Sequence, residues 1–323
     1  MNPLSALLGV GVEVRNRLYD RGTLQTRRLR APVVSVGSIS AGGAGKTPFL
    51  IMLGGLLKQR GVAFDVLSRG YGRRTTGVAV VDPAASPRAF GDEPLLIARK
   101  LGVPVVVGGD RFAAGSLAEE KFGPRLHLLD DGFQHRALAR EFDIVLIAGR
   151  DLHDSLLPVG RLREPLWSLA RASAVVAMDD AAVGHIPLRP GQLVWRVLRG
   201  ITVAPTGAAC FAFCGIARPE NFYAELRRAG IRLAGTRAFR DHHAYSEADA
   251  RALLKQRTES GAAALITTEK DAVNLGELMA LLQPIHIVTV GMQFEPVGLA
   301  DAESPIGQIC AAIGPWNQRP VRK

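Results

Sequence analysis

Short apolar runs alternate with longer segments of helical periodicity along the first 180 residues. The β-branched run at 32–37 predicts a buried strand. Residues 47–61 carry apolar side chains at helical spacing and end in Lys58, Arg60 and Gly61, which is typical of a helix C-terminus. Further strands are predicted at 64–72 (leading into a glycine-rich loop), 77–81, 104–109, 125–131, 142–149 and 173–180, and further helices at 91–102 and 110–123.

This alternation predicts an α/β fold with a mostly parallel sheet and helices on both faces. A proline-containing break at 185–192 separates it from a second stretch of α/β pattern. We therefore predict a first α/β domain at 31–189 and a smaller C-terminal α/β domain at 190–323. Residues 1–30 form a separate N-terminal segment.

The N-terminal segment is apolar from Pro3 to Val14, interrupted by Glu13, and is followed by six arginines between Arg15 and Arg30. It is shorter than the roughly 20 apolar residues that a spanning helix needs. An apolar helix with a basic end is typical of a helix that lies in the membrane interface, with its arginines on anionic headgroups. The alternative is a helix packed on the domain with a solvated basic end.

The composition narrows the choice of partners. The 323 residues are 47% hydrophobic and carry a net charge of +10 with a pI near 10.1, so an acidic partner is expected. Nucleic acid, an anionic membrane and a phosphorylated substrate all qualify. Cys210, Cys214 and Cys310 have the spacing of neither a zinc site nor a disulfide framework, and we interpret them as reduced thiols.

The loop SAGGAGKTP, from Ser40 to Pro48, lies between a predicted strand and a predicted helix. It matches the phosphate-binding P-loop except at its first position, where serine replaces glycine. Its glycines allow backbone N–H groups to surround phosphate oxygens, Lys46 reaches the β- and γ-phosphates, and Thr47 binds Mg²⁺. The predicted nucleotide-binding residues are Ser40, Ala41, Gly42, Gly43, Ala44, Gly45, Lys46 and Thr47. The alternative is a glycine-rich turn without a ligand.

Asp130 and Asp131 follow an apolar strand and precede Gly132. Two adjacent carboxylates at a strand end are costly unless a cation or hydrogen-bond donors satisfy them, so we predict a Mg²⁺ site. An acidic turn is the alternative. Because ligands of parallel sheets bind at the carboxyl ends of the strands, the P-loop, Arg69, Asp92 and the two aspartates are expected to gather there.

Eight motifs occur in the order seen in the tetraacyldisaccharide 4'-kinase family, the lipid A kinases of Gram-negative bacteria, which this chain resembles. They cover about residues 30 to 275, and serine at the first P-loop position is normal in that family. The motifs are VGSISAGGAGKTP, LSRGYG, GDEP, LLDDGFQHRALAREFDIVLI, LPVGRLREP, CGIARPENF, FRDHHAYS and TTEKDAV.

The resemblance implies transfer of the γ-phosphate of ATP, with Mg²⁺, to the 4'-hydroxyl of a lipid A disaccharide precursor that carries a 1-phosphate. It also implies a peripheral enzyme on the cytoplasmic face of the inner membrane. By motif, Asp92 resembles the catalytic base and His242 its partner, while Asp130, Asp131 and Glu164 resemble the metal-binding acids. The remaining candidates contact the substrate and are Arg69, Tyr71 and Arg111.

Some of these residues have simpler interpretations. Asp92 could cap a helix N-terminus, His242 and His243 could form a surface turn, and Arg111 could be a solvated helix start. If Asp92 is the base, a histidine beside it either orients it or shares its proton.

Two other classes of protein are alternatives. A GTPase would need an N-K-x-D motif, but in TTEKD Lys270 directly precedes Asp271. The second class is non-enzymatic, either a nucleotide-gated membrane adaptor or a nucleic-acid binder. The sequence has no RNP, zinc-finger or helix-turn-helix signature, so we expect no nucleic-acid partner.

Overall fold

The computed structural model of the chain describes residues 3–182, 184–204, 207–295 and 304–314. All three predicted segments, 1–30, 31–189 and 190–323, therefore include some residues outside the described ones. The α-helices are α1 Pro3–Asp20, α2 Lys46–Gln59, α3 Pro87–Phe90, α4 Asp92–Leu101, α5 Arg111–Phe122, α6 Pro219–Arg228, α7 Glu247–Glu259, α8 Glu269–Leu275 and α9 Pro305–Ile313. Short 3₁₀ helices are η1 Gly149–His153, η2 Leu166–Arg171 and η3 Gly276–Ala280.

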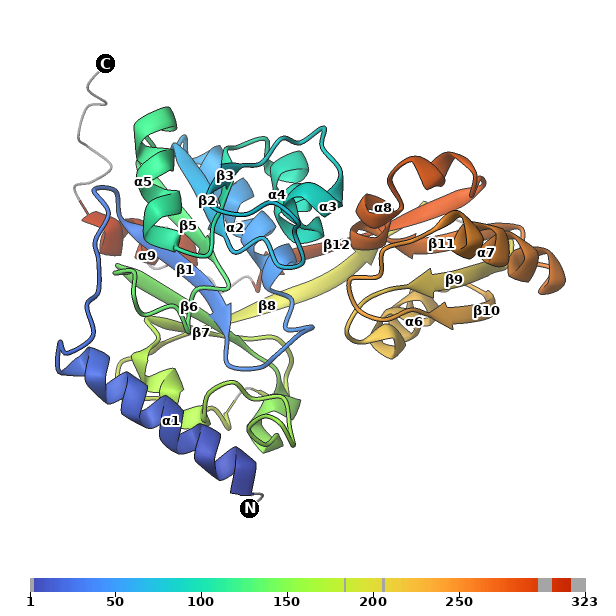
Figure 1. Ribbon diagram of the computed structural model, residues 1–323. Coiled ribbons are helices and arrows are strands. Elements are labelled where there is room, and N and C mark those ends of the chain that lie inside the picture. Colours follow the sequence, from blue (N-terminus) through green and yellow to red (C-terminus); the bar gives the residue numbers. More distant parts are fainter. Residues whose placement is uncertain (1–2, 183, 205–206, 296–303, 315–323) are drawn as a thin grey trace.

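The strands form one twelve-stranded sheet within the described residues, in the order β10-β9-β11-β12-β8-β7-β6-β1-β5-β2-β4-β3 (Figure 1). Neighbours are parallel except β12 with β8 and β3 with β4. The strands are β1 Val33–Ser38, β2 Phe64–Ser68, β3 Ala79–Val80, β4 Val105–Val107, β5 Leu126–Asp130, β6 Phe142–Ile147, β7 Ala174–Ala177, β8 Leu193–Thr202, β9 Cys210–Cys214, β10 Leu233–Ala238, β11 Ala264–Thr268 and β12 Ile285–Phe294.

The predicted α/β class with a mostly parallel sheet is confirmed. The predicted strands and helices of the first 180 residues are present with ends shifted by a few residues. The strand expected at 77–81 is the exception, because only Ala79 and Val80 pair with β4, at the edge of the sheet.

Three strand ends carry the predicted loop and acids to one edge of the sheet. β1 lies between β5 and β6, and Val36 is level with Asp130. β2 pairs with the other side of β5 and ends at Ser68, directly before Arg69. Because the carboxyl ends of parallel strands meet at one edge, the P-loop after β1, Asp130 and Arg69 converge there.

A two-stranded antiparallel ribbon joins the two halves of the chain. β8 pairs with β7 through Leu193–Arg196 and then with β12 through Val197–Thr202, and in Figure 1 β8 and β12 cross the middle of the molecule. Beyond the ribbon, β9, β10 and β11 carry α6, α7 and α8. Since the sheet is continuous across residue 190, the division at 189/190 stays a prediction about domains.

The last described helix returns to the first half of the chain. Ile306, Ile309 and Ile313 of α9 are buried in the same apolar cluster as Val34 of β1 and Leu53 of α2. The C-terminal segment thus adds to the core under the P-loop sheet as well as to the second α/β unit.

Helix α1 packs on the domain by one side only. Ser5 donates to the Leu156 carbonyl, and Asn16 is 3% exposed. The opposite side presents Leu4, Leu7, Val10 and Val14, which are 50% to 69% exposed. The helix therefore packs on the domain, as one of the two alternatives predicted. It also keeps an exposed apolar face, which the membrane-interface alternative requires. No helix in the described ranges has both the length and the apolar character to cross a bilayer.

Candidate active site

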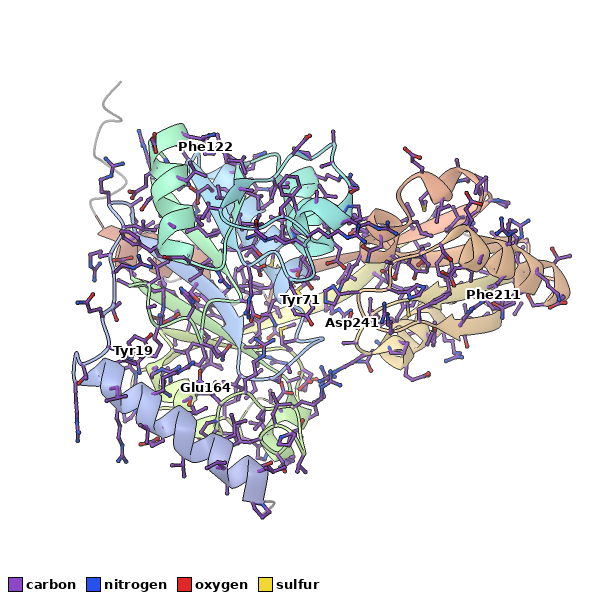
Figure 2. All side chains as sticks on the ribbon, viewed as in Figure 1. Tyr19, Tyr71, Phe122, Glu164, Phe211 and Asp241 are labelled. Atoms are coloured by element: carbon purple, nitrogen blue, oxygen red, sulfur yellow. The ribbon has the colours of Figure 1, made fainter. Side chains whose placement is uncertain are left out.

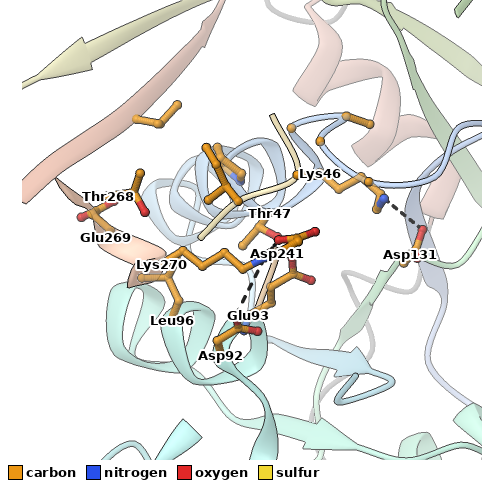
Figure 3. A pocket seen from close by; sticks show the side chains of 18 of the residues that line it. Lys46, Thr47, Asp92, Glu93, Leu96, Asp131, Asp241, Thr268, Glu269 and Lys270 are labelled. Atoms are coloured by element: carbon orange, nitrogen blue, oxygen red, sulfur yellow. Dashed lines mark hydrogen bonds and ion pairs between the residues drawn. The ribbon is translucent and has the colours of Figure 1, made fainter. Parts of the chain in front are cut away.

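A cleft of about 800 Å³ lies at the edge where the P-loop, β5 and the C-terminal unit meet (Figure 3). Its walls come from α2 and α4 on one side and from β12, α6 and α8 on the other. Most residues predicted from the sequence line it, namely Gly42, Gly43, Ala44, Gly45, Lys46, Thr47, Arg69, Tyr71, Asp92, Asp130, Asp131 and His242.

The P-loop has the backbone that a phosphate cradle requires. Gly42, Gly43 and Gly45 have φ angles of 66°, 65° and 78°, a region that side chains rarely adopt. A Cβ on Gly43 would meet Arg218 at 3.2 Å, so the loop is also closely flanked. Helix α2 begins at Lys46 without a side-chain cap and without an acid in its first turn. Its N-terminal N–H groups and partial positive charge therefore favour an anion, so the loop fits a nucleotide phosphate.

Ser40 and Ala41 differ from the prediction, because they do not line the cleft. Ser40 is 1% exposed and forms a β-bridge with Leu162, and the Ala41 amide donates to the Arg161 carbonyl at 2.7 Å. These two residues fix the start of the loop to residues 161–162. A small residue at position 40 suits this buried place, which is why serine replaces glycine there without changing the loop.

Lys46 links the P-loop to the acidic end of β5. Its Nζ lies 3.4 Å from Ser38 Oγ and 3.4 Å from Asp131 Oδ1. Asp131 Oδ2 accepts a hydrogen bond from Arg163 at 2.8 Å, and Asp130 accepts one from Ser68 at 2.9 Å. Asp131 has φ 50°, and it and His242 are the only non-glycine residues with positive φ in the described part of the chain. Strained backbone of this kind is concentrated at functional sites.

The two aspartates are held in different states. Burial raises the pKa of Asp130 to about 7, and the nearby Glu93 and Asp131 add to the rise. Burial also raises the pKa of Asp131, but the charges of Lys46 and Arg163 outweigh it, so that this pKa lies below its usual value. Asp131 is thus an anion in the free protein, whereas Asp130 needs a further positive charge to ionise fully at neutral pH.

These residues fit a Mg²⁺ ion that is shared with phosphates. No group of three or more His, Cys, Asp or Glu side chains in the described ranges is placed to hold a metal by itself. Mg²⁺ needs only one or two carboxylates when waters and phosphate oxygens complete its octahedron. Asp130, Asp131 and Thr47 offer such a set, and the raised pKa of Asp130 marks a carboxylate that a cation would stabilise.

Asp92 is the first residue of α4, is 5% exposed and meets His242 across the cleft. Both of its carboxylate oxygens contact His242 Nδ1, at 3.0 Å and 2.9 Å. Asn274 donates to its Oδ2 at 3.1 Å, and the Glu93 amide donates to its Oδ1 at 2.9 Å. The N-cap position itself belongs to Gly91, so capping does not explain a buried Asp92.

The contacts between Asp92 and His242 shift the pKa values of both side chains. Burial raises the pKa of Asp92, but the hydrogen bond from His242 and the charge of Lys270 outweigh it and lower this pKa overall. Burial lowers the pKa of His242, whereas the hydrogen bond to Asp92 raises it above the usual value. Asp92 is therefore an oriented anion that faces the cleft.

The two adjacent histidines lie in different places. His243 contacts Asp249 of α7 at 3.2 Å and stacks on Phe239, with ring centroids 4.6 Å apart. His242 instead faces Asp92 and Tyr71, whose ring centroid is 5.3 Å away. The geometry separates the two roles that the sequence left open, since only His242 lines the cleft.

Glu164 and Arg111 differ from the prediction. Glu164 is fully buried and accepts from Arg171 at 2.9 Å and from Asn16 of α1 at 3.2 Å, so it lies beside α1 and away from the cleft (Figure 2). Arg111 is 5% exposed and donates to the carbonyls of Gly108 and Gly109. Both side chains have local partners, and neither lines the cleft. Arg111 is not a solvated helix start either.

Three residues were missed by the sequence reasoning, namely Arg163 and Lys270, which line the cleft, and Asn274 beside it. Arg163 pairs with Asp131, although its neighbour Glu164 was the residue singled out. Lys270 and Asn274 of α8 contact His242 and Asp92 respectively. Lys270 stands in the TTEKDAV motif, which signalled a site but not a role.

A model of the protein family described as tetraacyldisaccharide-1-P 4'-kinase matches residues 1–305. The chain is 51% identical over 323 residues to a tetraacyldisaccharide 4'-kinase of Koribacter versatilis (strain Ellin345), covering 97% of this chain and 98% of the relative. It is 38% identical over 315 residues to a tetraacyldisaccharide 4'-kinase of Geobacter metallireducens, covering 90% and 92%.

A solved structure is also similar. The crystal structure of an LpxK from Aquifex aeolicus in complex with ATP superposes with a TM-score of 0.78 at 32% identity. The match covers 96% of this chain and 98% of that one. The similarity therefore includes both halves of the molecule and the ribbon between them.

Proposed function

This chain belongs to the tetraacyldisaccharide-1-P 4'-kinase family, and from that premise we propose how its residues carry out the reaction. It is an ATP-dependent kinase that transfers the γ-phosphate to the 4'-hydroxyl of a tetraacyldisaccharide 1-phosphate in lipid A biosynthesis. The observation that carries the residue assignment is one cleft that holds both the P-loop with Lys46 and the Asp92–His242 pair.

The P-loop binds the nucleotide phosphates. Backbone N–H groups of Gly42 to Thr47 and the N-terminus of α2 surround them, and Lys46 neutralises charge on the β- and γ-phosphates. In the free protein Asp131 holds the Lys46 ammonium within 3.4 Å, so the side chain is positioned before the nucleotide arrives. Ser40 and Ala41 contribute by anchoring the loop.

Asp130, Asp131 and Thr47 would hold Mg²⁺, and the ion would neutralise charge on the nucleotide phosphates. Arg163 keeps Asp131 ionised and oriented, and Ser68 orients Asp130.

Asp92 accepts the proton of the sugar hydroxyl. Its lowered pKa makes it a weak base, which suits a transfer in which the hydroxyl loses its proton late. His242 and Asn274 hold the carboxylate in place. Arg69 and Tyr71 lie on the cleft rim and contact the acceptor, with Arg69 toward its phosphate.

Helix α1 docks the enzyme on the cytoplasmic face of the inner membrane. Leu4, Leu7, Val10 and Val14 form the apolar stripe of α1, spaced three or four residues apart on its exposed side. Arg17 and Arg21 are exposed at the C-terminal end of α1, where anionic headgroups would meet them. Farther along, Arg27, Arg28 and Arg30 pair with acids of the domain. Because the acceptor lipid resides in a membrane, this exposed apolar surface would hold the enzyme where its substrate is.

The docking is tested by vesicle co-sedimentation of the full chain. The double variant Leu7→Asp, Val10→Asp places two charges in the apolar stripe of α1 and should weaken binding to anionic vesicles at least about tenfold, since two apolar side chains that would enter the bilayer are lost. Leu281→Asp is the matched control, because Leu281 is 56% exposed at the end of η3. Equal binding of the double variant and wild type would rule out α1 as the docking element.

The reaction itself is tested with γ-labelled ATP and tetraacyldisaccharide 1-phosphate in detergent micelles. Label should appear on the acceptor lipid, and none should appear on the same lipid with its 4'-hydroxyl methylated. Competition with unlabelled GTP should leave transfer nearly unchanged. Transfer to the methylated lipid would contradict the assigned position, and preference for GTP would contradict the assigned nucleotide.

A further inference from the structure

The ammonium of Lys270 has three hydrogen-bond acceptors around it in the cleft, of which Figure 3 labels Asp241 and Glu93, and Asp92 Oδ2 lies farther away at 3.8 Å. Its Nζ lies 3.1 Å from Asp241 Oδ1, 3.3 Å from His242 Nε2 and 3.5 Å from Glu93 Oε1. An ammonium has three N–H bonds and no lone pair, so these three contacts use all of its donors.

The contact with His242 decides which ring nitrogen carries the proton. Because Lys270 can only donate, Nε2 must supply a lone pair, and a neutral imidazole then carries its hydrogen on Nδ1. That hydrogen points at the Asp92 carboxylate, 2.9 Å and 3.0 Å away. We propose that Lys270 is a positioning residue that opposes protonation of His242 at Nε2 and fixes its proton on Nδ1, so that His242 orients Asp92 by donating to it.

The rest of α8 supports this role. Asn274 lies one turn after Lys270 on the same face of the helix and donates to Asp92 Oδ2 at 3.1 Å. One helix therefore holds both members of the pair, the carboxylate through Asn274 and the imidazole through Lys270.

The backbone of His242 is held from the same motif. Asp271 is fully buried and accepts from the Gly215 amide and from the Tyr245 hydroxyl, each at 2.8 Å. The Gly215 carbonyl accepts from the His242 amide at 3.2 Å. This connection keeps His242 at φ 57°, a conformation that non-glycine residues rarely adopt without support. The TTEKD motif thus fixes both the backbone and the ring of His242.

The charges that face His242 come from three elements. Asp92 belongs to α4, Lys270 to α8, and Asp241 to the loop of His242 itself, with Tyr71 as the neighbouring ring. Glu93 of α4 acts at one remove, through Lys270. Burial lowers the pKa of His242 and the carboxylates raise it, while Lys270 opposes the carboxylates. Removing the Lys270 charge therefore raises this pKa further.

The inference rests on the proposed role of Asp92 and specifies the fate of the proton. The O–H bond of the sugar breaks, its proton goes to an Asp92 oxygen, and the sugar oxygen uses its electron pair to bond phosphorus while ADP leaves. His242 keeps its Nδ1 proton throughout. Of the two roles open to such a histidine, orienting the base or sharing its proton, His242 therefore has the first.

Nitrogen NMR of the ¹⁵N-histidine-labelled full chain tests the tautomer without any turnover. His242 signals are assigned by their loss in His242→Asn. Wild type should show the Nδ1–H tautomer above neutral pH, and Lys270→Met should raise the titration midpoint of His242 by about one pH unit. Lys270→Arg keeps the charge and should stay near wild type. An Nε2–H tautomer in wild type, or an unmoved midpoint in Lys270→Met, would overturn the inference.

The pH dependence of kcat supplies the functional readout. If neutral His242 is required, activity is lost as pH falls through its pKa, so the acid limb of Lys270→Met should move to higher pH. At neutral pH kcat should fall by up to about tenfold with little change in KM for ATP, as a one-unit rise of the midpoint dictates, whereas a merely structural loss would lower kcat equally at every pH. Should wild type fail to phosphorylate the lipid while the NMR result holds, the proposed function fails and the tautomer assignment stands.

Discussion

Replacing Lys46 with alanine is expected to lower kcat by at least about 1,000-fold, which corresponds to about 4 kcal/mol of transition-state stabilisation. Lys46 Nζ lies at the start of α2 between Ser38 and Asp131, where it meets the phosphates that the P-loop binds. A transferring phosphoryl group is stabilised almost entirely by position and charge, so no other group can replace this ammonium at the same point.

The loss should be confined to catalysis. Asp131 keeps its hydrogen bond from Arg163, so the variant leaves no isolated buried anion and should unfold at nearly the wild-type temperature. Lys255→Ala is a matched control, because Lys255 is 75% exposed on α7 and pairs only with Glu259 among the residues described. A folded Lys46→Ala enzyme with near-normal kcat would show that the loop does not bind the transferring phosphate.

Replacing Asp92 with asparagine is expected to lower kcat by about 1,000-fold while KM for ATP changes little, because a general base contributes on the order of 100- to 10,000-fold. Asparagine has nearly the same shape, but it cannot accept the sugar proton. Burial raises the pKa of Asp92, yet His242 and Lys270 lower it further than burial raises it. The carboxylate is therefore ionised throughout the neutral range, and the acid limb of the wild-type pH profile should not come from Asp92.

Steady-state rates of purified Asp92→Asn in detergent micelles measure this effect. Glu247→Gln is the matched control, since Glu247 is also the first residue of a helix but is 70% exposed. Thermal unfolding of both variants separates folding from catalysis. A rate within about twofold of wild type in Asp92→Asn would assign the base to another residue.

Local pattern was enough to predict the features that depend on neighbouring residues. The strand, the glycine loop and the helix at 32–61 are encoded by β-branched residues, glycines and helical periodicity within about 30 positions, so the P-loop could be placed from the sequence alone. Asp130 and Asp131 could be placed for the same reason, because they end an apolar strand. The order of eight motifs added the family and, with it, Asp92 and His242.

What lies across the cleft depends on how distant segments pack. Asp92 and His242 are 150 positions apart and meet because β8 and β12 carry the second α/β unit up to α4. Arg163 and Glu164 are neighbours in one motif, yet Arg163 reaches Asp131 and Glu164 turns toward α1. Local pattern cannot settle such directions, because the free energy that selects them comes from burial and charge pairing with residues far away in the chain. Lys270 shows the same limit: its motif was visible, but its role depended on which three acceptors the fold placed around it.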